Sequence, residues 1–216
     1  MRLHVVQSPP AVQSSIPGPP SGSGDRSRRA VLERSVQMAS REGLEGLTIG
    51  ALAAELGVHK SNVFALFGSK QELQLATLAS AREMLVELVI RPGLRQPAGL
   101  ARLEAIGEAW CDYLGADVFA GGCFLCAASA EMDGRPGRVR DALEAVMREW
   151  LAVLAANIEA AVAAKELTAD TDAAAMAFRL NALGMAANWQ RQLLGETSAV
   201  ELAREAWHAE LARSRR

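Results

Sequence analysis

The chain has 216 residues, of which 50% are hydrophobic and 5% aromatic, and its formal net charge is −2. This length is enough to bury a substantial core in one large or two small domains. The near-neutral charge excludes a protein that coats nucleic acid by overall basicity, and no apolar run approaches the roughly 20 residues of a membrane span.

Residues 1–25 are rich in proline, serine and glycine and carry almost no charge. We expect a disordered tail there, without the apolar core of a signal peptide. Residues 26–75 hold seven Lys/Arg against five acids, whereas residues 76–216 hold fifteen against nineteen. The sequence therefore predicts a modestly basic unit followed by an acidic body. Three cysteines without a secretion signal predict reduced thiols and a cytoplasmic protein.

The basic unit should contain a helix over about residues 27–41 and two shorter helices between residues 48 and 68. Thr48 can cap the first short helix, and Gly57 can end it in the left-handed conformation. The second short helix begins with four polar residues, His59, Lys60, Ser61 and Asn62. Two helices joined by a glycine turn, the second polar at its start, are typical of a DNA-reading helix-turn-helix.

A capping box should open the next helix, with Ser69 as the cap and Glu72 reaching back to it. Lys70 then projects from a helix N-terminus, where the free N–H groups and the helix dipole already favour an anion. We therefore expect Lys70 to contact a DNA phosphate.

This stretch closely resembles the DNA-binding domain of the tetracycline-repressor (TetR) family over roughly residues 28–75. The matching residues are Arg29, Val31, Leu32, Gly43, Thr48, Ile49, Ala53, Gly57, Val58, Phe64, Phe67, Ser69, Lys70 and Leu73. Phe64 stands where the family usually has a tyrosine whose hydroxyl meets a phosphate. His59 stands where the family often has a serine or threonine that caps the recognition helix.

The candidate DNA-contacting residues are Arg28, Arg29, Thr48, His59, Lys60, Ser61, Asn62, Phe64 and Lys70. Asn62 could pair with adenine and Lys60 with guanine, although a solvated helix start is the simpler alternative. Arg28 and Arg29 could reach phosphates or the minor groove as an arm, or they could be a solubilising charge run.

The body, residues 76–216, continues the helical pattern. Helices are expected over 71–90, ending at Arg91-Pro92-Gly93, and then over 97–113, 123–132, 138–165 and 172–194. A second capping box at Ser198 and Glu201 should open a last helix to about residue 212. Because no alternating strand pattern is present, the predicted class is all-α.

Residues 121–137 also resemble the ligand-binding half of many TetR-like regulators. The resemblance implies about nine helices and a homodimer formed by the last two helices as a four-helix bundle. The candidate dimer residues are Ala182, Ala186, Trp189, Leu193, Leu202 and Trp207. Ordinary core packing is the alternative for each of them.

An effector pocket would need large apolar side chains and a few polar partners. The candidates are Trp110, Phe124, Met147, Trp150, Phe178 and Met185, with Asn181 and Asn188 as polar partners. For each side chain taken singly, core packing is the more frequent role.

Cys123 and Cys126 form a C-x-x-C, a spacing that can bind metal or cycle as a dithiol. Zinc would need two further ligands, and the three histidines of the chain, His4, His59 and His208, form no HxxxH. We therefore expect buried thiols, no metal and no cofactor. A reactive pair stays possible, because a helix N-terminus lowers the pKa of a thiol.

No catalytic signature stands out, so the chain is not expected to be an enzyme. The interpretation is a DNA-binding transcriptional regulator, most simply a repressor released from a near-palindromic operator by a small apolar effector. Two alternatives stay open: a C-x-x-C thiol-redox protein or sensor, and a helical interaction protein that does not bind DNA.

Overall fold

The helical periodicity of the sequence is realised along the described chain. The computed structural model describes residues 23–216, with side chains from residue 27 onward. Within that range the one strand-like pairing is an isolated bridge between Leu167 and Arg215, so the all-α prediction is confirmed. Of the predicted tail, residues 1–22 lie outside the described residues, and residues 23–25 begin the first helix.

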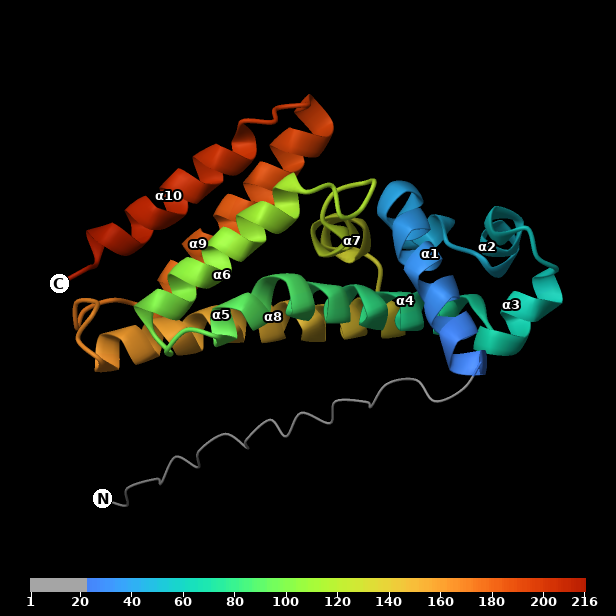
Figure 1. Cartoon of the computed structure of the whole chain (residues 1–216), viewed down its shortest axis with the longest axis horizontal. Coiled ribbons are helices and arrows are strands. Elements are labelled where there is room, and N and C mark those ends of the chain that lie inside the picture. The colour runs from blue at the N-terminus through green and yellow to red at the C-terminus, as the bar shows by residue number, and fades with distance from the viewer. Residues whose placement is uncertain (1–22) are drawn as a thin grey trace, which may run out of the picture.

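The helices divide into a small unit at one end of the molecule and a longer body (Figure 1). In chain order they are α1 (Ser23–Gly46), α2 (Ile49–Leu56), α3 (Lys60–Phe67), α4 (Lys70–Leu85), the π-helical turn η1 (Val86–Ile90), α5 (Arg91–Leu94), α6 (Leu100–Gly115), α7 (Phe124–Met132), α8 (Arg138–Ala163), α9 (Ala173–Trp189), the π-helical turn η2 (Gln190–Leu194) and α10 (Ala199–Arg213). When α4, η1 and α5 are taken as one rod, the described residues form nine helices, as expected. None of these helices is long and apolar enough to cross a membrane.

The small unit consists of α1, α2 and α3, and its local signals act as predicted. The Thr48 hydroxyl accepts the N–H of Ala51 at 3.1 Å, which caps α2. Gly57 ends α2 with a φ of 65°, a conformation that glycine adopts without a Cβ clash. Leu52 and Val63 are fully buried between the helices, which holds α2 and α3 in a helix-turn-helix.

α1 extends to Gly46, beyond its predicted end at residue 41, with a break at Gly43, where φ is 77°. The carboxylate of Glu131, at the end of α7, accepts the N–H groups of Leu44 at 2.7 Å and Glu45 at 2.8 Å. A Cβ atom at Gly43 would lie 2.8 Å from the nearer of these carboxylate oxygens. The end of α1 is therefore shaped by a distant acid, which local sequence patterns cannot reveal.

The connecting rod begins at Ser69, whose hydroxyl accepts the N–H of Glu72 at 3.1 Å. The prediction that the Glu72 carboxylate reaches back to the cap is wrong. This carboxylate instead binds Arg138 of α8 at 2.7 Å. The rod also passes its predicted stop, because η1 resets the helix and Pro92 falls in the first turn of α5. Proline is tolerated there, since a first-turn N–H has no helical partner.

A tryptophan cluster holds the body together. The Trp110 ring of α6 lies 4.9 Å from that of Trp150 in α8 and 6.1 Å from that of Trp207 in α10, both edge-on. Gly184 of α9 lies flush against this cluster, since a Cβ there would sit 2.2 Å from Trp110. The second predicted capping box is wrong: Ser198 makes no capping hydrogen bond.

Candidate DNA interface, effector cavity and dimer surface

The outer surface of α3 is polar at its start and is backed by an apolar inner face. Lys60, Ser61 and Asn62 are exposed, while Val63 and Phe67 behind them are buried at 1% and 7% exposure. The buried pair fixes the helix, so the three polar side chains leave from a rigid backbone. A helix that reads bases in the major groove has this arrangement.

The residues flanking this polar start take different roles. His59 is the N-cap of α3, and its Nδ1 accepts the N–H of Ser61 at 3.4 Å, so it caps as a serine or threonine would. The Thr48 hydroxyl is likewise engaged as the α2 cap and is half-buried. Phe64, one turn after the polar start, is 55% exposed. A phenyl ring of that size left outside the core is available to a partner.

Most cations of residues 27–75 have a partner within the subunit. The pairs are Arg29 with Glu33 (3.3 Å), Arg34 and Arg41 with Glu55 (2.8 and 3.4 Å), Arg28 with the Phe67 ring (5.3 Å) and Lys70 with Glu45 (2.9 Å). Over this segment Lys60 is the cation for which the structure shows no ion pair, hydrogen bond or ring contact. It is therefore the charge that DNA can engage without breaking an existing contact.

Lys70 folds back toward the end of α1. Its ammonium donates to the Glu45 carbonyl at 2.8 Å and to the Glu45 carboxylate at 2.9 Å. This hydrogen bond from Lys70 lowers the pKa of the Glu45 carboxyl. A phosphate contact by Lys70 therefore requires exchange of the Glu45 carboxylate for the phosphate.

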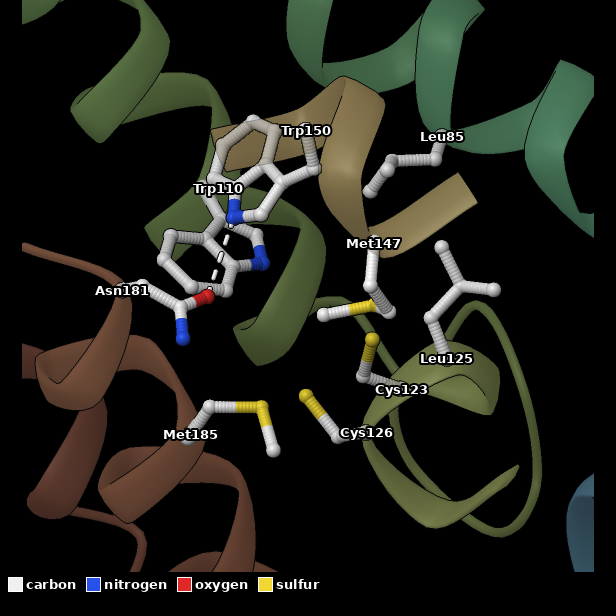
Figure 2. A pocket seen from close by; sticks show the side chains of 9 residues that line it. All are labelled: Leu85, Trp110, Cys123, Leu125, Cys126, Met147, Trp150, Asn181 and Met185. Carbon is white, nitrogen blue, oxygen red and sulfur yellow. Dashed lines mark hydrogen bonds between the residues drawn. The ribbon is translucent and has the colours of Figure 1, made fainter. Parts of the chain in front are cut away.

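A small cavity lies inside the body, where the helices that carry the small unit meet the helices of the bundle (Figure 2). Its volume is about 10 Å³, and its lining residues are Leu85, Trp110, Cys123, Leu125, Cys126, Met147, Trp150, Asn181 and Met185. The Trp150 indole N–H donates to the Asn181 side-chain oxygen at 3.0 Å, so these polar groups satisfy each other. The rest of the wall is apolar or sulfur.

Cys123 and Cys126 stand at the start of α7 and are buried, at 4% and 7% exposure. A hydrogen bond from the Cys126 thiol lowers the pKa of Cys123 to about 7, against the burial that raises it. The same hydrogen bond and burial raise the pKa of Cys126 well above its ordinary value. The expected buried thiols are confirmed, and their helical surroundings are not the βαβ context of a thioredoxin-like site.

The cavity wall is connected to the small unit through α7 and the loop before it. The Gln37 side chain of α1 donates to the Val118 carbonyl at 2.7 Å, and the Gly121 N–H donates to the Ser40 hydroxyl at 3.2 Å. At the other end of α7, Glu131 holds the last turn of α1. Leu85, which lines the cavity, is the last residue of α4 before η1. A change in the cavity can therefore reach the helices that carry α3.

A stripe of exposed apolar side chains runs along α9, η2 and α10. Its members and their exposures are Phe178 (71%), Trp189 (55%), Leu193 (67%), Leu194 (56%) and Leu202 (59%). Ala182 and Ala186 lie exposed on α9, and their small side chains would allow another helix to approach closely. Large exposed apolar side chains gathered on two neighbouring helices are typical of a protein interface.

Two sequence profiles match the chain and together cover both units. "Bacterial regulatory proteins, tetR family" matches residues 31–77, and "Tetracyclin repressor-like, C-terminal domain" matches residues 99–207. The chain belongs to the TetR family. It is therefore a ligand-responsive DNA-binding transcriptional regulator, of a family whose members are generally non-enzymatic. A comparison with curated proteins finds no match.

Solved structures of transcriptional regulators share the fold. A TetR transcriptional regulator from Chloroflexus aurantiacus superposes with a TM-score of 0.82 at 21% identity, covering 89% of this chain and 98% of that one. A TetR-family regulator from Cytophaga hutchinsonii gives 0.78 at 19% identity, covering 91% and 98%. A putative regulator from Saccharomonospora viridis, solved in complex with choline, gives 0.73 at 20% identity, covering 87% and 96%.

The cavity of this TetR-family chain gathers five of the eight predicted pocket residues. They are Trp110, Met147, Trp150, Asn181 and Met185. Phe178 was wrongly placed, because it lies on the outer side of α9. Phe124 packs against the Phe119 ring at 6.4 Å, and the Asn188 side chain accepts the Cys123 N–H at 2.8 Å from behind the wall. Sequence reasoning missed the two cysteines as lining residues, although their C-x-x-C spacing already singled them out.

Five of the six predicted dimer residues lie on the exposed surface, and one lies in the core. Ala182, Ala186, Trp189, Leu193 and Leu202 lie exposed on α9, η2 and α10. Trp207 was wrongly included, because it is 2% exposed and its indole N–H donates to the Leu103 carbonyl at 3.2 Å within the subunit. Phe178, assigned to the pocket from sequence, lies instead on the exposed stripe.

Proposed function

We propose that this TetR-family regulator is a cytoplasmic repressor that binds a near-palindromic operator as a homodimer and catalyses no reaction. The observation that carries the proposal is the outer face of α3. It combines an unpaired lysine, a hydroxyl, an amide and an exposed aromatic ring on a helix whose inner face is buried. This set supports base reading better than a solvated helix start, because a helix that faces only solvent gains nothing from exposing the apolar ring of Phe64.

Each residue of the reader has a role that follows from its chemistry. Asn62 pairs with an adenine edge, and Lys60 contacts a guanine or a nearby phosphate. Phe64 packs against a thymine methyl or a sugar, because it lacks the hydroxyl that would bond a phosphate. Arg28, Arg29 and Lys70 add phosphate contacts that carry no base information. His59 and Thr48 serve mainly as caps that hold the reader in shape.

The dimer forms through the exposed stripe of α9, η2 and α10. Two copies of the stripe would bury one continuous apolar surface by an isologous contact, in which the same patch serves both subunits. This contact places the two copies of α3 at a fixed separation. Operator half-sites are then expected about 34–36 Å apart or at a multiple of that distance.

Effector binding at the cavity would change the separation of the two readers. The cavity borders the end of α4 and the start of α7, both of which contact the small unit. An effector that binds one arrangement of these helices more tightly than the other shifts the population, and release follows if the favoured conformer cannot bind the operator. The present volume of about 10 Å³ admits no drug-sized apolar molecule unless these helices separate.

A selection from a random double-stranded DNA pool tests the proposal. The bound pool should converge on an inverted repeat, and Asn62→Ala should broaden the half-site consensus. Ala79→Ser, an exposed change on α4 away from α3, is the matched control. If the pool stays random with the unaltered protein, the chain is a helical interaction protein and not an operator-binding repressor.

A further inference from the structure

Four sulfur-containing side chains line the cavity. Figure 2 shows the sulfur ends of Cys123, Cys126, Met147 and Met185 turned toward the same space, with Trp110 and Trp150 beside them. The cysteines begin α7, whereas Met147 belongs to α8 and Met185 to α9. Three helices thus supply sulfur to the lining of one cavity.

The size of the cavity restricts what it can hold. Its volume of about 10 Å³ is close to that of a single probe sphere, the minimum that accommodates one water molecule. A water molecule needs polar partners, and this wall offers few. A monatomic ion of similar size would fit among the sulfur atoms without separation of the helices.

The ligand set selects the kind of ion. Thiolate and thioether sulfurs are soft ligands that favour Cu(I). Zinc takes cysteine, histidine and carboxylate ligands rather than thioethers, and in the described chain no group of three or more such residues could hold a metal. The sequence-based prediction of no metal counted cysteines and histidines only. It therefore overlooked the two methionines that other helices bring to the C-x-x-C.

We propose that the cavity binds one Cu(I) through Cys123, Cys126, Met147 and Met185, and that this ion is the effector of the regulator. The effector role rests on the proposed function, whereas the binding site does not. Binding forms a Cu–S bond at each cysteine sulfur, and the two thiol protons that are displaced leave to solvent. No electron is transferred. The two thioethers complete the ligand set without adding charge.

The surroundings support and transmit the binding event. The Tyr113 hydroxyl donates to the Cys123 sulfur at 3.7 Å and can orient it as an outer-sphere partner. Drawing the sulfur ligands toward one ion pulls the start of α7 toward α8 and α9. The far end of α7 carries Glu131, which holds the last turn of α1. The same movement therefore reaches the small unit that carries α3.

Binding is tested by anaerobic titration of the reduced, full-length protein with Cu(I) against a chromogenic Cu(I) chelator. We expect one Cu(I) per subunit, lost in Cys123→Ser/Cys126→Ser and kept in Cys111→Ser, which alters the buried cysteine outside the cavity lining. Met147→Leu/Met185→Leu preserves side-chain volume and should weaken Cu(I) binding. The loss should be about tenfold or more, because removal of an outer-sphere partner alone typically costs that much. Zn(II) should not compete.

Two results would overturn the metal site: no Cu(I) retained against the chelator, or retention unchanged in both double variants. Thermal melts of the variants show whether a loss reflects unfolding, and the methionine pair stays decisive if the serine pair does not fold. DNA binding is measured separately with the selected operator. Cu(I) should release the parent protein at one equivalent and leave the methionine variant bound.

The two proposals can fail independently. If the metal-free protein binds its selected operator, but Cu(I) neither binds the protein nor releases it from the operator, the copper inference is wrong and the repressor stands. If Cu(I) binds through the four sulfurs but no DNA is ever selected, the metal site stands and the repressor, with the effector role, is wrong.

Discussion

The ion pair between Lys70 and Glu45 should lower the affinity of the protein for DNA. If Lys70 contacts a phosphate in the complex, each reader must first give up this pair, whose side chains are 40% and 49% exposed. An exposed ion pair contributes about 0.2–1 kcal/mol. Glu45→Gln removes the charged partner of Lys70 and leaves the hydrogen bond to the backbone carbonyl of that residue. It should therefore tighten operator binding at every sequence.

A dimer carries two readers, so the gain doubles to about 0.4–2 kcal/mol, or about 2- to 30-fold in Kd. Lys70→Ala should have the opposite effect. It should reduce the slope of log K against log salt by about 0.9 for each lost phosphate contact, and thus by about 1.8 for the dimer. Both effects are independent of sequence, because a phosphate carries no base information.

Fluorescence anisotropy with a labelled operator, measured over a series of salt concentrations, gives both quantities. Glu42→Gln removes a neighbouring exposed acid near the end of α1 and controls for the general loss of negative charge. The double variant Glu45→Gln/Lys70→Ala closes the cycle. If Glu45→Gln raises operator affinity as much in the Lys70→Ala background as in the parent, Lys70 does not contact DNA and the reasoning is refuted. The same conclusion follows if Glu45→Gln raises operator affinity no more than Glu42→Gln does.

Three further outcomes are expected. Asn62→Ala should relax preference at one half-site position by about 1–3 kcal/mol, measured by competition with single-base operator variants. Trp189→Arg should convert the dimer to monomer in sedimentation velocity, whereas Leu151→Arg, at a leucine of α8 that is 36% exposed, should not. Gly184→Ala should lower Tm by about 2–12 °C, because overpacking costs about 1–3 kcal/mol and each kcal/mol shifts Tm by about 2–4 °C. Gly50→Ala, with open space at the new Cβ, should not lower Tm.

Each of these outcomes has a clear opposite. Equal discrimination by Asn62→Ala and the parent would remove Asn62 from the set of base-reading residues. A dimer that survives Trp189→Arg would move the interface away from the exposed stripe. A Tm for Gly184→Ala no lower than that of the parent would mean that the Trp110 ring can shift aside at little cost.

Local chemistry determined much of this protein from the sequence alone. The caps at Thr48 and Ser69 and the helix end at Gly57 appear in the structure as predicted. Such features depend on neighbours one to four residues away, so a single stretch of sequence contains all the groups involved. The helix-turn-helix is a succession of these local signals, and it was therefore predictable together with the polar start of α3.

Tertiary packing decided what local signals leave open. α9 is apolar almost all round, so its periodicity does not distinguish the side facing the core from the side facing a partner. Phe178 was therefore assigned to the pocket although it lies on the outer stripe, at 71% exposure. Glu72 likewise bound Arg138, 66 residues away, in place of its own helix cap.

The sulfur-lined cavity is the clearest case of a feature that only the tertiary structure decides. Cys123 and Cys126 are neighbours in sequence, but Met147 and Met185 reach them from α8 and α9. A methionine in a helical repeat has the same pattern whether it fills the core or faces a ligand. Its role is set by which helices pack together and at what rotation, and that depends on contacts such as Gly184 against Trp110, which join residues far apart in the chain.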